Sequence, residues 1–113
     1  MISGEQKKKI AALCQEELKR LTGKGPSEIV ITAVSGFINI RCDGFMTHIE
    51  QSLAKCTDGD KLVVAIRKRL FDNVKENITN QVEEIISAKP SYFFDDYLPS
   101  EDSQSISIIY DLK

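Results

Sequence analysis

A glycine-rich stretch, Gly23-Lys24-Gly25-Pro26, is the first place where this sequence could bind a ligand, because glycine and lysine recur in phosphate loops. Such a loop needs a preceding strand and a following helix, whose N–H groups face the phosphates. Here an amphipathic segment precedes the stretch, and Pro26 leads into a β-branched run. Because a helix C-terminus repels anions, we interpret the stretch as a helix end.

The chain contains one histidine, His48, within the sequence Thr47-His48-Ile49-Glu50. A nucleophile paired with a histidine is one possible chemistry, so an enzyme that uses His48 is an alternative. The sequence offers no G-x-S-x-G motif to supply a serine and no second histidine to share a metal. Thr47 and Glu50 instead match a capping box, and we expect His48 to begin a short helix.

A group of carboxylates near the end of the chain could also do chemistry. Oxygen ligands of this kind bind divalent cations, but their spacing matches no EF-hand loop. We interpret them as a solvated acidic turn, and a catalytic role for them stays an alternative. No catalytic residue, metal or cofactor is expected, and we favour a non-enzymatic function. The four carboxylates are Asp95, Asp96, Glu101 and Asp102.

Cysteine usage and charge exclude several classes of protein. Cys14, Cys42 and Cys56 form no C-x-x-C pair, which excludes a zinc ribbon and a thioredoxin-like motif. We expect all three to be buried, reduced thiols in the cytoplasm. The net charge of −2 argues against a nucleic-acid-binding protein. No apolar run approaches the ~20 residues that span a bilayer, and residues 1–9 do not match a signal peptide.

The elements that position these residues are organised around one long amphipathic segment, residues 58–87. Its apolar residues recur in steps of three or four, as on one face of a helix. At about 1.5 Å per residue, this helix would be roughly 40 Å long. Arg67, Lys68 and Arg69 would lie on its polar side, either solvated or in contact with phosphates or an acidic partner. The expected apolar stripe consists of Leu62, Ile66, Leu70, Val74, Ile78, Val82 and Ile85.

Shorter elements flank the long helix. A first helix should begin with a capping box of Ser3 and Gln6 and end at Gly23, with Glu17 outside its apolar stripe. Strands are expected at residues 29–34, 37–42, 91–96 and 106–112, with a loop at residues 97–104. The order α-β-β-α-α-β-β predicts a single α+β domain over residues 1–113. Its two layers would be a four-stranded, mainly antiparallel sheet and helices on one face.

The order of these signatures resembles a bacterial and archaeal family, formerly a domain of unknown function and now labelled MpsC-type. The resemblance depends on the G-K-G-P element at residues 23–26, the G-x-x-T-x-x-E-x-x-L element at residues 44–53, and a long helix that carries Arg67. It extends from about residue 5 over nearly the whole chain. The family label refers to a proposed sodium-translocating, membrane-potential-generating system. The resemblance therefore implies an association with a membrane system, and it assigns no catalytic residue.

The sequence departs from the family pattern at two places. The family often has proline after the threonine, where this chain has His48, and both residues can begin a helix. The family also often has a histidine just before the acidic residue of the third strand. This chain has Phe93-Phe94-Asp95-Asp96 there, so it lacks any role that the histidine has in the family.

We expect a cytoplasmic, non-enzymatic interaction module that forms a homodimer and has a possible membrane-protein partner. The long helix would overhang a sheet whose strands span about 20 Å, and its second half would contact the second copy. The expected dimer interface consists of Val74, Ile78, Val82, Ile85 and Ile86. The alternative is a small-molecule or anion sensor with a site between the sheet and the helices. The residues expected at that site are Arg41, Gly44, Thr47, Glu50 and Arg67.

Overall fold

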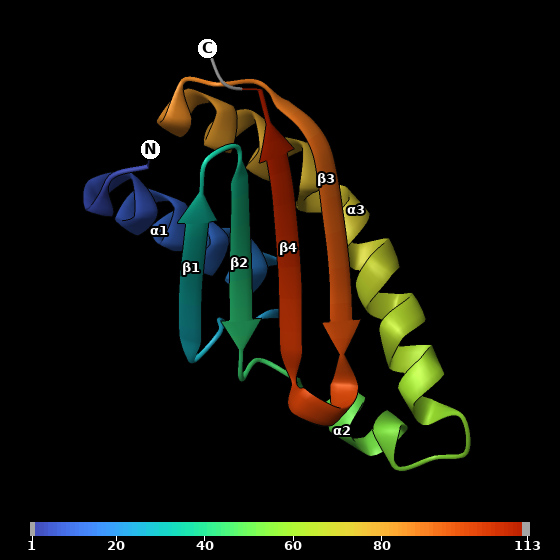
Figure 1. The fold of residues 1–113 in the computed structure, drawn as a ribbon. Helices are drawn as coiled ribbons and strands as arrows, with labels where there is room; N and C mark the ends of the chain where they lie inside the picture. Colours follow the sequence, from blue (N-terminus) through green and yellow to red (C-terminus); the bar gives the residue numbers. More distant parts are fainter. Residues whose placement is uncertain (1, 112–113) are drawn as a thin grey trace.

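The structure is a computed structural model and describes residues 2–111. Figure 1 shows a sheet with helices packed behind it. The elements in order are α1 (Gly4–Thr22), β1 (Glu28–Val34), β2 (Phe37–Asp43), α2 (His48–Ala54), α3 (Gly59–Ile86), β3 (Pro90–Leu98), the 3-10 turn η1 (Pro99–Glu101) and β4 (Ser103–Tyr110). The predicted α+β order is confirmed. Leu112, expected in the last strand, lies outside the described residues.

The four strands form one sheet in the order β1-β2-β4-β3, and each neighbouring pair is antiparallel. Alternate side chains of the central strands β2 and β4 point toward the helices and are fully buried, as Ile38, Ile40, Ile106 and Ile108 illustrate. The helices lie on one side of the sheet only (Figure 1), as predicted. No helix within residues 2–111 covers the other side, which we call the open face.

Local signals set the helix ends where the sequence predicted them. Ser3 and Gln6 form a capping box at the start of α1, and Thr47 and Glu50 form a second one at the start of α2. Gly23 ends α1 with a φ of 81°, a left-handed conformation that glycine adopts without steric cost. These ends depend on residues close in sequence, and the sequence therefore defines them well.

The buried face of α3 differs from the predicted stripe in its first half. Val63, Arg67 and Phe71 face the core there, whereas Leu62 and Ile66 are exposed. Neighbouring residues on a helix point about 100° apart, so the prediction was wrong by one position in this half. Arg67 was expected on the polar side but is buried, and Val63 and Phe71, one turn before and after it, lie on the same face. From Val74 onward the predicted and observed faces agree.

The bounds predicted for the loop at residues 97–104 were wrong at both ends, because the loop in the structure is shorter. β3 continues to Leu98 and β4 begins at Ser103, so that Tyr97 pairs with Gln104 and both are buried. The connection is tight because η1 follows directly and Asp102 adopts a φ of 47°. Proline, serine and acidic residues favour a loop, but the chain needs only a short one here.

Glu17 was expected outside the apolar stripe of α1, and this was also wrong. Its side chain is 2% exposed and lies between α1 and α3. The Oε1 atom accepts hydrogen bonds from Asn77 Nδ2 and from Arg20 Nη2, the latter at 3.1 Å. The Oε2 atom has no hydrogen-bond partner in the described residues. Glu17 is therefore a polar contact within the helix layer.

The cysteines follow the prediction in two of three cases. Cys14 and Cys42 are buried, and burial raises the pKa of the Cys14 thiol to about 12. Burial also raises the pKa of the Cys42 thiol. Cys56 is exposed instead, and it lies two residues beyond the end of α2 at Ala54.

Candidate functional site

A buried ion pair joins α2 to α3. Arg67 is 3% exposed and Glu50 is 6% exposed. Arg67 Nε donates to Glu50 Oε2 at 2.5 Å, and Arg67 Nη2 donates to Glu50 Oε1 at 2.6 Å. Two parallel bonds of this kind are the strong, bidentate form of an arginine–carboxylate pair. The positive charge of Arg67 is therefore balanced inside the chain.

Two aromatic rings enclose the guanidinium group. Its carbon lies 4.2 Å from the centroid of the Phe45 ring and 4.5 Å from that of Tyr97. The two rings meet edge to face, at 86° and with centroids 6.0 Å apart. Both contacts have the geometry of a cation–π interaction, and Arg67 Nη2 also donates to the Phe45 carbonyl at 2.9 Å. The side chain of Arg67 is held on several sides.

Asp102 ties this cluster to the corner between β3 and β4. Its carboxylate accepts hydrogen bonds from the backbone N–H groups of Phe45 and Met46, at 3.2 and 3.0 Å. It also accepts from the Tyr97 hydroxyl at 2.9 Å. We call Phe45, Glu50, Arg67, Tyr97 and Asp102 the buried cluster. It links the loop before α2, the helices α2 and α3, and the turn after β3.

The protonation states suit a structural role for the buried cluster. Burial alone would raise the pKa of the Glu50 carboxyl, but Arg67 and the Thr47 N–H hydrogen-bond the charged form and lower the pKa. Burial and the hydrogen bond to Asp102 raise the pKa of Tyr97. Glu50 thus stays ionised and Tyr97 stays protonated near neutral pH. Neither pKa shifts toward the neutral range that a general acid or base needs.

The structure brings together some of the residues expected to bind a ligand. Thr47 donates to Glu50 Oε1 through its backbone N–H at 2.9 Å and its hydroxyl at 3.0 Å, and Arg67 completes the group. Gly44 lies at the end of β2, where its φ is 74° and a Cβ would be 2.0 Å from the Ser27 hydroxyl. Glycine is therefore needed there for the turn.

Arg41 lies apart from the other residues of the expected ligand site. It is exposed on the open face, where its guanidinium Nε donates to Asp43 Oδ1 at 3.1 Å. Glu101 is the second carboxylate near it, at 3.9 Å. The hydrogen bond to Asp43 raises the pKa of Arg41. An anion held by both Arg41 and Arg67 does not fit this arrangement.

Three members of the buried cluster were not found from the sequence. Phe45 lies inside the motif at residues 44–53, but nothing in the motif marks its ring as a partner of an arginine. Tyr97 and Asp102 come from a segment far along the chain from Glu50. Their contacts exist only when β3 and β4 fold beside α3, so no local signal could have found them.

A mostly apolar groove of about 450 Å³ lies beside the buried cluster. It is formed where the end of α1, α2 and the first half of α3 meet. Its volume is within the range of about 300–1,000 Å³ common for ligand pockets. Thr47 and His48 place polar groups at its edge. The lining residues are Leu21, Thr22, Thr47, His48, Ile49, Glu50, Leu53, Ile66 and Leu70.

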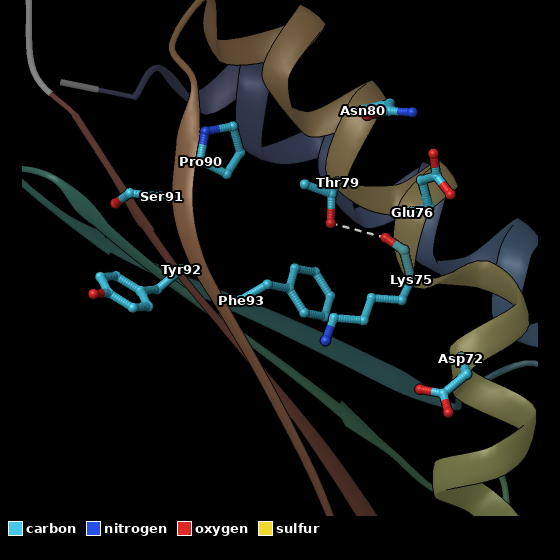
Figure 2. Close-up of a pocket in the computed structure, with 9 residues that line it drawn as sticks. All are labelled: Asp72, Lys75, Glu76, Thr79, Asn80, Pro90, Ser91, Tyr92 and Phe93. Atoms are coloured by element: carbon cyan, nitrogen blue, oxygen red, sulfur yellow. Dashed lines mark hydrogen bonds between the residues drawn. The ribbon is translucent and has the colours of Figure 1, made fainter.

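A second hollow, of about 360 Å³, lies between α3 and β3 (Figure 2). Lys75 extends toward Phe93, with Nζ 5.3 Å from the ring centroid. Figure 2 shows Tyr92 and Ser91 on the far side of β3 from this contact. Because its charged groups have both signs and do not converge, we assign no ligand to it.

The open face carries most of the exposed apolar side chains. Tyr92 is 62% exposed and Phe94 is 55% exposed, and their rings stack with centroids 6.0 Å apart and an angle of 11°. Cross-strand pairing places four apolar residues side by side at one end of this face. We call these four the apolar row: Val34, Phe37, Ile109 and Tyr92.

The residues expected at a dimer interface lie inside the chain. Val74, Ile78 and Val82 are buried, and Ile85 and Ile86 are partly buried against the core. The sheet and α1 of the same chain pack against this part of α3, so little of these side chains is exposed. The second half of α3 is therefore part of the core, and a second copy would need another surface.

Within residues 2–111, no three side chains of the types His, Cys, Asp or Glu are grouped so as to hold a metal ion. None of the helices in this part of the chain combines the length and apolar character needed to cross a membrane.

Comparison with known proteins gives one match. A protein-family model described as MpsC, Na+-translocating membrane potential-generating system, matches residues 3–112. Neither a curated protein nor a solved structure matches the chain. The family model covers the G-K-G-P element, the motif at residues 44–53 and the long helix.

Proposed function

The chain belongs to the MpsC family, and from this membership we propose that it is a non-enzymatic interaction module, accessory to a cation-translocating membrane system. The family description names a Na+-translocating membrane potential-generating system. In this proposal the chain is cytoplasmic, assembles with a second copy and contacts a membrane-protein partner.

The apolar row on the open face carries the proposal. Together with Phe94 it forms a continuous apolar surface on which every member but the half-buried Phe37 is exposed, and the rings of Tyr92 and Phe94 stack. Contiguous apolar patches of a few hundred Å² often mark interaction sites on soluble chains, and aromatic residues are enriched in the core of interfaces. A binding partner would remove this surface from water, which is favourable by about 25 cal/mol per Å² of apolar area.

The buried cluster supports a non-enzymatic function. Arg67 and Glu50 neutralise each other, and Asp102 is occupied by two backbone N–H groups and the Tyr97 hydroxyl. A catalytic group must reach a substrate, whereas these side chains are turned toward one another inside the chain. Their arrangement positions helices and loops, and the exposed surface remains for a partner.

The proposal can be tested with a photo-crosslinking amino acid in the native host. Placed at Phe94, it should form an adduct with a membrane protein upon irradiation. Placed at Glu83, an exposed position on α3, it should form none. Equal adducts from both positions, or adducts from Phe94 with soluble proteins alone, would contradict the proposal.

A second candidate function is a sensor of a small apolar molecule, and the groove of about 450 Å³ favours it. An apolar ligand fits better than an anion because Glu50 already pairs with Arg67. Thermal-shift measurements with medium-chain alcohols and uncharged aromatic metabolites test this, since a ligand of the folded state raises Tm with concentration. The same shift in an Ile66→Arg variant, whose groove is blocked, would count against this site.

A further inference from the structure

The two edges of the sheet differ, and from this difference we infer that β1 pairs antiparallel with β1 of a second copy. The pairing would join two four-stranded sheets into one continuous sheet. It rests on the proposed interaction module and assigns a surface to its self-association. The expected interface on α3 is buried, which leaves the position of the second copy open to this assignment.

The β3 edge is protected against pairing. The strand begins at Pro90, and its register shifts between Pro90 and Tyr92. Asp95 pairs with the buried Ile106 and thus lies on the helix side, while Asp96 lies on the open face. Prolines, irregular registers and inward-pointing charges are the features by which natural sheets block further strands. α3 also runs beside this edge in Figure 1.

The β1 edge has none of these features. Its residues 29–34 read Ile-Val-Ile-Thr-Ala-Val, without proline or charge, and the one charged residue is Glu28 at the start. Most of these residues are β-branched, as in stable strands. The outer side of the strand has unpaired backbone groups, because an edge strand hydrogen-bonds on one side only. This edge is a template for another strand.

Charge favours a second copy in antiparallel orientation. With Ile31 opposite Ile31 of the second copy, all seven residues of β1 overlap. Glu28 then lies opposite Val34, and the two Glu28 carboxylates are six residues apart, roughly 20 Å. Parallel pairing in register would place the two carboxylates directly opposite each other, which destabilises a sheet. The strand is therefore complementary to itself in one orientation.

The helix layer is compatible with this pairing. A twofold axis perpendicular to the sheet keeps the helices of both copies on the same side. Figure 1 shows the first turns of α1 extending beyond the outer edge of β1. In the pair, these turns would cover the helix side of the other copy's β1, where Ile29, Ile31 and Ala33 are only partly buried in one chain. Both apolar rows would remain free on the opposite side.

The test uses two charged variants of the full chain. Val30 and Thr32 lie on the open face and are exposed, and they oppose each other across the inferred pair. Val30→Lys with Thr32→Lys should abolish the dimer, and so should Val30→Glu with Thr32→Glu. An equimolar mixture of the two variants should restore it, because each lysine then faces a glutamate. Sedimentation equilibrium at micromolar concentration gives the mass in each case.

A matched control changes the other edge. Asp96→Lys with Leu98→Lys, on the open face of β3, should leave the wild-type dimer intact. A monomeric wild-type chain overturns the inference, and so do charged variants that stay dimeric or a mixture that stays monomeric. If the paired substitutions fail to fold, Val30→Lys and Thr32→Glu as single variants replace them, because in their mixture the lysine faces the glutamate and the mixed dimer should form in preference to either homodimer. None of these outcomes changes the crosslink expected from Phe94. Failure of the β1 pairing can therefore be distinguished from failure of the proposed function.

Discussion

The buried cluster and the open face reverse the usual distribution of side chains. In the cluster, Arg67 and Glu50 are almost fully buried, whereas on the open face Tyr92 and Phe94 are more than half exposed. A buried ion pair is tolerated only with excellent geometry and further hydrogen bonds, and the cluster supplies both. Exposed aromatic rings contribute little to folding. The comparison indicates that the inner polar groups hold the fold, whereas the outer apolar groups are exposed for the binding that we propose.

The largest effect is expected from removing one partner of the ion pair. Arg67→Ala leaves the Glu50 carboxylate buried and unpaired, and this should lower the free energy of unfolding by about 3–5 kcal/mol. Urea unfolding followed by circular dichroism measures the loss. Replacing both residues, as Arg67→Leu with Glu50→Leu, should cost less, because no charge is then left without a partner.

Arg41→Ala is the matched control for this prediction. Arg41 also pairs with a carboxylate, but it does so on the exposed open face. Water and salt screen such a pair, and no measurable change in unfolding is expected. Equal losses from Arg41→Ala and Arg67→Ala would contradict the contrast between the two regions.

Acid should weaken the buried cluster in a defined pH window. The pKa of Glu50 is lower in the folded chain than its ordinary value of 4.5, so the unfolded chain binds more protons in this range. The stabilisation is complete above about pH 4.5 and is lost as the pH falls through the folded pKa. Urea midpoints between about pH 7 and pH 3 should fall more steeply for the wild type than for Glu50→Gln. Parallel curves would show that Glu50 is not the titrating group.

A smaller loss of stability is expected when a hydroxyl at the edge of the buried cluster is removed. Tyr97→Phe removes the hydroxyl that donates to Asp102 but keeps the ring beside Arg67. Asp102 retains its two backbone donors, so the cost should be about 1 kcal/mol, the net value of one hydrogen bond. Urea unfolding measures it, with Tyr92→Phe as the control, since that side chain is exposed. A loss as large as that of Arg67→Ala would mean that the hydroxyl organises the whole cluster.

Elements defined by neighbouring residues could be predicted from the sequence. The capping boxes at Ser3 and Thr47, the glycine at position 23 and the alternation along the strands are local signals. They gave the order of the elements and the layer of helices. Asn39 and Arg41 alternate with the buried residues of β2, and both lie on the open face.

The buried cluster could be predicted only in part. Thr47 and Glu50 were found because a capping box lies within four residues. The burial of Arg67 depends on Phe45, Tyr97 and Asp102, which come from other segments. Helical periodicity does not contain this information, and the buried face predicted for the first half of α3 was therefore wrong by one residue. The open face could not be predicted for the same reason. The alternation of residues along β3 does not show which side of this strand the helices cover.

The smallest effect on stability is expected on the open face, where the effect on binding should be largest. Tyr92→Ser should change the free energy of unfolding by no more than about 0.5 kcal/mol, as at other surface positions. Phe93→Ser, one residue along, should cost several times more, because that ring faces the helices and lies 6.0 Å from Phe71. Urea unfolding compares the two variants. Tyr92→Ser should also remove the adduct that forms from a photo-crosslinker at Phe94. If Tyr92→Ser instead costs as much stability as Phe93→Ser, the open face belongs to the folded core.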